Sequence, residues 1–283
     1  MVTDANRGEL KRISISALSV LVLFAGMHSH AVDIPPPGKA LDFDGANDAV
    51  SLTNSASFQS VTTSLTIEAW VKADNIVNED VVFMANNRYS LQLTGAGSIK
   101  TGIKIDEGWC EGTSTVSIAT GAWHHVALTY DGDVIRFYID GQASGETNVT
   151  DGAIDADNDD PLSIGANKAG DAGGDNWFSG NIDEVRIWND VRTVDEIRAN
   201  MYKELSGSED NLVAYYKLNE MDITDPGYAA DSSANGNNGT YADDMTDADC
   251  VTSGAFTGPR NCLDFDGSDD FVSIASDLCL CPL

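Results

Sequence analysis

Positive charge is scarce in this 283-residue chain: 16 lysines and arginines stand against 45 aspartates and glutamates, which gives a net charge of −29 at pH 7. The acids are scattered along the sequence instead of forming one acidic tail. Such a surface repels DNA, RNA and anionic lipid, so we expect no nucleic-acid partner. The charge is compatible with divalent-cation binding, and equally with a surface that only keeps the protein soluble.

The chain also lacks the residue patterns of a hydrolase. After the N-terminal leader only His124 and His125 remain, and as neighbours in a predicted strand they must point to opposite faces. No Glu-x-Asp-x-x-Glu triplet occurs, although alternate strand positions would be needed for two carboxylates to flank a glycosidic bond. The nearest acidic phrase, Asp183-Glu184, is predicted to place its carboxylates on opposite faces. We predict no catalytic residues and no enzyme activity.

Only one extended apolar stretch occurs, residues 13–26, and it follows Arg7, Lys11 and Arg12. Ser29 and Ala31 then supply small residues, a pattern typical of a signal peptide that is cleaved after Ala31. An uncleaved anchor is the alternative, but the stretch is shorter than the roughly 20 residues of a spanning helix. We therefore expect a secreted or cell-surface protein without membrane insertion after cleavage.

One phrase occurs twice, at 41–52 and 263–274, with eight of twelve positions identical. A separation of 222 residues is the size of a sandwich domain and exceeds the roughly 20 to 50 residues of a solenoid repeat. We predict a proline-rich linker at 32–38, one domain at 39–220, and a linker with the start of a truncated second copy at 221–283. Alternatively, the last residues complete the sheet of the first domain.

The chain has only five cysteines, which is an odd number. In an oxidising compartment at least one of them lacks an intramolecular partner. A bridge between Cys250 and Cys262 is one disulfide compatible with the sequence, and it would lie just before the second copy. Cys110, Cys279 and Cys281 complete the set, and no spacing among the five matches a zinc site.

Short alternating segments dominate the region after residue 39. Leu65, Ile67, Ala69 and Val71 share one face of a predicted strand, and four further strands are predicted at 89–93, 123–130, 134–139 and 182–188. Asp-Gly pairs at 131 and 140 mark tight turns. A capping box at Thr193 and Glu196 opens a helix predicted over 193–205, which Gly207 ends. This pattern predicts an antiparallel β-sandwich, all-β apart from one short helix.

Five phrases in order resemble one family. They are Leu41-Asp-Phe-Asp-Gly45, Leu65-Thr-Ile-Glu-Ala-Trp-Val71, Trp123-His-His-Val-Ala-Leu-Thr-Tyr-Asp-Gly132, Phe137-Tyr-Ile-Asp-Gly141 and Asn181-Ile-Asp-Glu-Val-Arg-Ile-Trp188. Together they resemble a laminin-G-like jelly-roll domain of the concanavalin A-like lectin and glucanase superfamily, from Gly38 to Leu218. The passages at 212–220 and 231–240 are similar to those that close one module and introduce the next in tandem members.

The resemblance also implies a calcium site. It points to Asp44, Gly45 and Asn47 in the first repeated phrase and to Asp183, because calcium takes several carboxylate and carbonyl oxygens. The alternative is that Asp44-Gly45 only forms a turn and that Asp183 is a surface acid or a partner of Arg186. Calcium is thus the one cofactor expected. The acidic run 155–160 departs from a calcium loop and is interpreted as a solvated loop.

Carbohydrate binding requires exposed aromatic rings beside hydrogen-bonding side chains. Trp109 is the first candidate and Trp177 the second, with polar contacts from Asn86, Asn87 and Arg88. The alternative is that each tryptophan covers the rim of the core. The three remaining tryptophans, Trp70, Trp123 and Trp188, lie inside strand phrases and are expected to be structural.

These observations predict a non-catalytic recognition module that binds glycans or glycoproteins, within a larger chain that carries other domains. Linked weak binders gain avidity, which gives a tandem arrangement a use. One alternative is a structural or adhesive spacer, and the exposure of Trp109 separates it from the lectin hypothesis. A divergent glycosidase is the second alternative, which a pair of carboxylates in an open groove would favour.

Overall fold

The computed structural model describes residues 38–255, except 78, 107, 150–151, 156–160, 168–175, 221–222, 224–226 and 243–244. The predicted signal peptide, the linker before residue 38, the second copy at 263–274 and Cys262, Cys279 and Cys281 lie outside the described residues. Most of the acidic loop 155–160 lies outside them too. No helix in the described part of the chain is long and apolar enough to cross a membrane.

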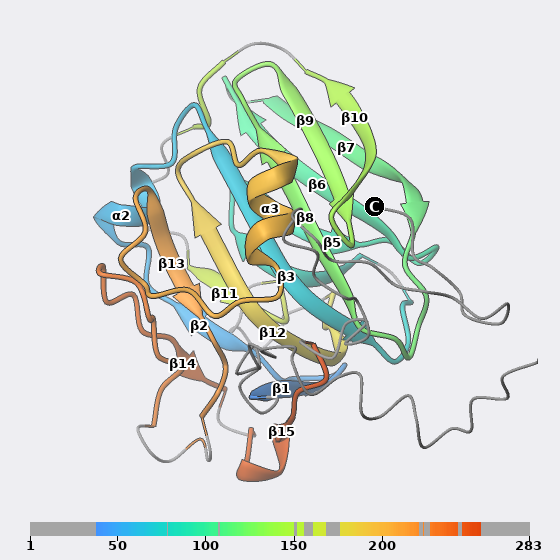
Figure 1. Ribbon diagram of the computed structural model, residues 1–283, viewed down its shortest axis with the longest axis vertical. Helices are drawn as coiled ribbons and strands as arrows, with labels where there is room; N and C mark the ends of the chain where they lie inside the picture. The colour runs from blue at the N-terminus through green and yellow to red at the C-terminus, as the bar shows by residue number, and fades with distance from the viewer. Residues whose placement is uncertain are drawn as a thin grey trace, which may run out of the picture. The chain divides into compact units, whose positions relative to one another are not determined.

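Strands dominate the described residues (Figure 1). They are β1 (Lys39–Asp44), β2 (Val50–Leu52), β3 (Leu65–Ala73), β4 (Asp80–Ala85), β5 (Tyr89–Leu93), β6 (Ser98–Ile105), β7 (Gly108–Ser117), β8 (His124–Tyr130), β9 (Val134–Ile139), β10 (Gln142–Asn148), β11 (Leu162–Ile164), β12 (Ser179–Trp188), β13 (Leu212–Tyr216), β14 (Thr240–Tyr241) and β15 (Cys250–Thr252). The helices are α2 (Ala56–Gln59), α3 (Val194–Asn200) and the 3-10 turn η1 (Asp247–Asp249). The expectation of a single helix missed α2, a single turn that buries Phe58.

Two antiparallel sheets form the predicted sandwich. Within the described residues, the first sheet has the order β10-β9-β8-β3-β12-β1-β15, with β13 also paired to β12. The second sheet has the order β14-β2-β11-β4-β5-β6-β7. Their facing apolar side chains form one buried cluster, to which β3 and β5 both contribute. The jelly-roll fold class predicted from the sequence is confirmed.

The predicted strands and tight turns are confirmed. β5 and β9 have the predicted bounds, and β8 begins one residue later than predicted. Asp131-Gly132 joins β8 to β9, which pair antiparallel, and Asp140-Gly141 has left-handed φ values of 50° and 69° at the turn into β10. Local turn chemistry therefore determined this part of the topology.

Both faces of the central strand β3 are buried, which alternation alone does not predict. Leu65 and Ile67 are fully buried in the core between the sheets, as expected. Glu68 and Trp70 on the other face are only 2% and 3% exposed. The reason is that α3 and the segment after it lie across this outer face of the first sheet, as Figure 1 shows.

Helix α3 begins as predicted but ends early. The capping box is present, since the Thr193 side chain accepts from the backbone N–H of Glu196, and the Glu196 side chain accepts from that of Thr193. The helix ends at Asn200 instead of 205. Trp70 Nε1 donates to the carbonyl oxygen of Met201 at 2.6 Å, and Arg186 donates to that of Asn200. Side chains from the sheet satisfy carbonyls that a longer helix would have paired.

The sandwich uses more of the chain than residues 39–220. β14 pairs with β2, and β15 pairs with β1 at the edge of the first sheet. The described part of 221–283 thus contributes two strands to the sheets. Cys110 and Cys250 form no disulfide within the described residues.

Candidate functional site

Trp109 stands on the outer face of the second sheet with half of its surface exposed. It is the second residue of β7, at the edge of the sheet, and pairs with Lys104 of β6. Its exposed fraction is 50%, against 3% or less for Trp70 and Trp188. A methyl group at Gly102 of β6 would lie 3.1 Å from Cε3 of the Trp109 ring. The ring therefore packs against a strand position that carries no side chain.

Charged side chains surround this ring. Lys100 and Lys104 lie two residues to either side of Gly102, so each is about 7 Å from it along the strand and on the same face. Glu111 pairs with Gly102 from β7. We call these four residues and Trp109 the Trp109 face. It combines an exposed indole with hydrogen-bond donors and acceptors.

The turn between β4 and β5 lies at the same end of the sheet. The N–H of Lys104 donates to the carbonyl oxygen of Arg88 at 2.8 Å, which joins this turn to the Trp109 face. Asn87 is exposed and has a left-handed φ of 58°. Of the polar residues predicted to contact a ligand, only Asn87 presents an exposed side chain.

Arg88 and Asn86 are buried and bind the protein itself. Arg88 has no exposed surface and donates to three carbonyl oxygens, those of Phe58, Val61 and Asp155. Asn86 is 7% exposed and donates to the carbonyl oxygen of Pro161. Their side chains hold loops against the sheet, so neither side chain is available to contact a ligand.

Trp177 lies away from the Trp109 face, near the start of β4. The carbonyl oxygen of Asn176 accepts from Val81 at the start of β4, whereas the Arg88 turn follows the end of β4. The indole is half-buried and packs against Ala49 and Ala166. The two predicted tryptophans therefore do not form one site.

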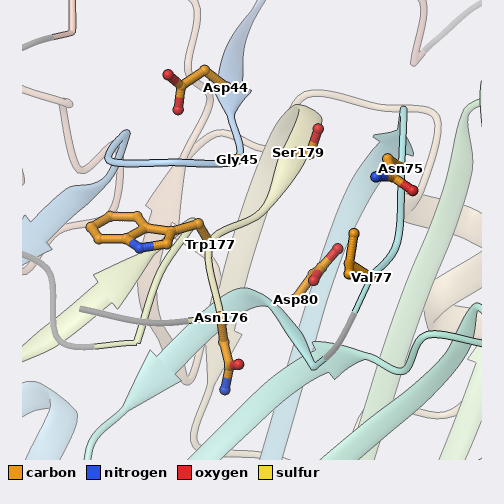
Figure 2. A pocket seen from close by; sticks show the side chains of 8 residues that line it. All are labelled: Asp44, Gly45, Asn75, Val77, Asp80, Asn176, Trp177 and Ser179. Atoms are coloured by element: carbon orange, nitrogen blue, oxygen red, sulfur yellow. The ribbon is translucent and has the colours of Figure 1, made fainter. Parts of the chain in front are cut away.

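A pocket of about 320 Å³ lies beside Trp177. It is lined by Asp44, Gly45, Asn75, Val77, Asp80, Asn176, Trp177 and Ser179. In Figure 2 the Trp177 ring and the Asp44 carboxylate are directed away from Asp80 and Val77 on the opposite wall. The pocket is thus shaped more by backbone turns than by converging side chains.

The predicted calcium residues are not brought together. Asp44 Oδ1 accepts from the N–H groups of Ala46 and Asn47, at 2.8 and 3.2 Å, as in a turn, and Gly45 supplies the left-handed φ of 79°. Asp44 pairs with Ser179 of β12. Ser179 comes four residues before Asp183, so the backbone positions of the two aspartates lie about 13 Å apart along the strand direction. One ion with ligands within about 2.6 Å does not reach both. No group of three acidic, histidine or cysteine residues suited to a metal occurs in the described part of the chain.

Asp183 and Glu184 do not follow the alternation predicted for them. β12 shifts register between Asp183 and Arg186, and Glu184 has a left-handed φ of 54°. Asp183 pairs with Trp70 on the outer face, while Glu184 bonds Tyr215 and Arg186 on that face. The prediction of opposite faces is wrong because a β-bulge inserts one residue.

The bulge completes a buried ionic cluster that the sequence did not reveal. Arg186 contacts Glu184 at 2.6 Å and Glu68 at 3.6 Å, and His125 Nε2 lies 3.4 Å from Glu68. Glu68, Glu184 and Arg186 are each at most 2% exposed. The sequence signal is charge inside two strand phrases, namely one acid in 65–71 and three charged residues in 181–188. Since α3 and its following segment cover the cluster, it joins that segment to the sheet.

Burial and mutual attraction set the charges of this cluster. Burial raises the pKa of Glu184, and attraction to Arg186 only partly offsets this. Burial also disfavours the charge on Glu68, but the hydrogen bond from His125 and attraction to Arg186 outweigh it and lower its pKa. Burial raises the pKa of Asp183 well above its ordinary value, with repulsion from Glu184 adding to the effect. These shifts follow from packing and give no evidence of access for a substrate.

Comparison with known proteins gives one family and a set of similar structures. A candidate carbohydrate binding protein from Bacteroides ovatus is 25% identical with a TM-score of 0.60, and the match covers 75% of this chain and 62% of that one. A heptameric SAP-like pentraxin from Limulus polyphemus is 18% identical (TM-score 0.42, covering 59% and 82%). The CBM40 of a Ruminococcus gnavus sialidase, bound to α2,3-sialyllactose, is 16% identical (TM-score 0.43, covering 58% and 93%).

No curated protein sequence matches. The chain spans 62% of the length of the Bacteroides ovatus protein. Residues 44–198 match the sequence family described as the concanavalin A-like lectin/glucanases superfamily. Because this match covers more than half of its residues, the chain belongs to that superfamily.

Proposed function

We propose that this domain binds carbohydrate without catalysis and that the Trp109 face is its binding surface. The observation that carries the proposal is the half-exposed indole lying against Gly102, with charged hydrogen-bonding groups on either side. A tryptophan whose ring already packs against the sheet offers the C–H face of a sugar ring an apolar partner at little cost in entropy. Membership of a lectin-containing superfamily and similarity to the Bacteroides ovatus protein support this proposal.

The groups beside the ring suit sugar hydroxyls. On the Trp109 face, Glu111 is an acceptor whose side chain is 62% exposed and Lys104 is a donor at 21%. Glu79, at 46%, is a further acceptor that contacts Lys100. Hydroxyl groups both donate and accept, so a surface with both kinds of partner fixes their orientation. Asn87, at the adjacent turn, adds a further amide that faces solvent.

The non-catalytic part of the proposal rests on where the carboxylates lie. The clustered acids Glu68, Asp183 and Glu184 are at most 2% exposed. A glycosidase needs two carboxylates that reach the same glycosidic bond from either side. These three are covered by α3 and by the segment around Ser253, so a glycan does not reach them.

The setting of the domain is also part of the proposal. The N-terminal stretch supports secretion, and the repeated phrase supports a place within a larger chain with other domains. If calcium binds, we propose that it binds at the turn of Asp44, Gly45 and Asn47, which borders the pocket beside Trp177. That region is separate from the Trp109 face, so we expect glycan binding not to require calcium.

The test is binding of the full chain to an array of oligosaccharides and polysaccharides, with calorimetric titration of any positive ligand. We expect Trp109→Ala to weaken binding at least about tenfold. Val116→Ala is the matched control, since Val116 lies on the same strand and is 53% exposed. We expect the same affinity in calcium and in chelator. A folded protein that binds no glycan would instead support the spacer hypothesis.

A further inference from the structure

Both lysines of the Trp109 face are held by carboxylates. Lys100 Nζ lies 2.6 Å from Glu79 Oε1 and 3.4 Å from Glu111 Oε1. Lys104 Nζ lies 3.6 Å from Asp155 Oδ2. Burial opposes the charge of Lys100, but the hydrogen bond and attraction from Glu79, with attraction from Glu111, outweigh it and raise the lysine pKa. Each ammonium group thus already has an anionic partner.

The balance of charge around the two lysines is negative. Among the described residues, two ammonium groups meet three carboxylates within 4 Å, and these five groups sum to a net charge of −1. The whole chain, this cluster included, carries a net charge of −29. A ligand carboxylate or sulfate that approached Lys100 would compete with two protein carboxylates and meet long-range repulsion as well.

Uncharged sugars meet no such obstacle. Paired lysines still carry N–H donors, and a carboxylate that faces solvent still accepts from a hydroxyl group. Stacking on the indole is indifferent to the charge of the ligand at sites away from the ring. The same surface that excludes an anion therefore retains all the contacts that a neutral sugar uses.

We propose that the Trp109 face selects neutral glycans over acidic ones, and that Glu79 and Glu111 set this selectivity by neutralising Lys100. The inference rests on the proposed function and names the ligand class of the same site. It makes Glu79 and Glu111 specificity-determining residues, although neither is needed for stacking on the indole. Uronic, sialylated and sulfated glycans are the ligands excluded.

The experiment titrates the full chain with matched neutral and acidic oligosaccharides, at low and at moderate salt. Neutral xylo-, gluco-, arabino- and galacto-oligosaccharides are compared with oligogalacturonate, sialyllactose and a sulfated galactan oligomer. We expect acidic ligands to bind at least about tenfold more weakly at low salt, and to gain affinity as salt screens the repulsion.

The double variant Glu79→Gln with Glu111→Gln tests the mechanism. Its Lys100 loses both of these carboxylate partners, so we expect the ratio of affinity for acidic ligands to affinity for neutral ligands to rise at least about fivefold over the wild type. The control is Glu146→Gln with Asp195→Asn, which removes the same charge from exposed positions elsewhere, at 63% and 89% side-chain exposure. This control should leave the selectivity unchanged.

The outcomes separate the inference from the function beneath it. Acidic glycans that bind the wild type as tightly as neutral ones, or more tightly, overturn the inference and leave the proposed function standing. A double variant with unchanged selectivity, or a control variant with the same gain, also overturns it. If no glycan of either class binds, the proposed function fails and the inference fails with it.

Discussion

Arg88 offers the sharpest test of the difference between sequence and structure, because the sequence suggested a ligand contact and the structure shows a buried anchor. Its guanidinium donates to the carbonyl oxygens of Phe58 at 2.9 Å, Val61 at 2.5 Å and Asp155 at 3.0 Å. Hydrogen bonds from a charged group contribute about 1.5–3 kcal/mol each, and carbonyl groups left buried without a partner add a penalty. The cost of burying the charge offsets part of this sum.

We therefore expect Arg88→Met, which keeps the volume and removes the donors, to lower the free energy of unfolding by about 3–5 kcal/mol. The assay is urea unfolding followed by tryptophan fluorescence. Arg136→Met is the control: that side chain is 35% exposed and pairs with Asp131 at the surface, so its loss should cost less than about 1 kcal/mol.

Glycan titration of the same two variants completes the test. At a temperature where Arg88→Met is folded, it should bind glycans with the affinity of the wild type, because its side chain does not reach solvent. A variant that unfolds within about 1 kcal/mol of the wild type and has lost glycan binding would refute the reasoning and make Arg88 a ligand contact.

Three further predictions follow from the site and the buried acids. Gly102→Val places a side chain where the Trp109 ring lies, because the new Cβ would be 3.1 Å from that ring. Glycan affinity should therefore fall at least about fivefold without loss of the far-ultraviolet circular dichroism signal. An unchanged affinity would contradict the role of the Trp109 ring in binding. The raised pKa of Asp183 means that the folded state binds a proton more readily than the unfolded state, so this group lowers stability as pH rises from the ordinary aspartate pKa through the raised one. Asp183→Asn should therefore become more stable relative to the wild type as pH increases, in urea melts from pH 4 to 8, and a constant difference would count against it. Asp44 is about 13 Å from Asp183. In calorimetry, Asp183→Asn should therefore leave unchanged any shift in melting temperature between calcium and chelator, whereas Asp44→Asn should remove that shift. The reverse result would place the ion at Asp183.

Short-range patterns accounted for most of the sandwich. Alternation identified β3, β5, β8, β9 and β12, and the two Asp-Gly pairs identified the tight turns on either side of β9. The capping box located the start of α3 to the residue. Each of these signals acts within a few residues of chain, where sterics and local hydrogen bonds decide the outcome. Trp109 is exposed, as the lectin hypothesis required, but the strand β7 that carries it was not among the predicted strands.

Several of the errors share one physical origin, because they involved partners distant in sequence. Strands β14 and β15 are two and three residues long, and they exist because β2 and β1 offer free edges far back in the chain. Arg88 and Asn86 looked like surface polar residues, and only tertiary contacts with loops at Val61 and Pro161 reveal them as buried anchors. Burial depends on what covers a residue, which local patterning does not encode.

The sequence by itself determined the fold class, the strands with strong alternation and the turn chemistry, because these depend on backbone sterics and on side-chain periodicity. Only the tertiary structure decided which polar residues are available to a ligand, that a bulge turns Glu184 toward Arg186, and that Asp44 and Asp183 stand apart. It also placed Lys100 between Glu79 and Glu111. Such pairings arise when strands far apart in sequence adopt one register, and a one-residue shift in register changes every one of them.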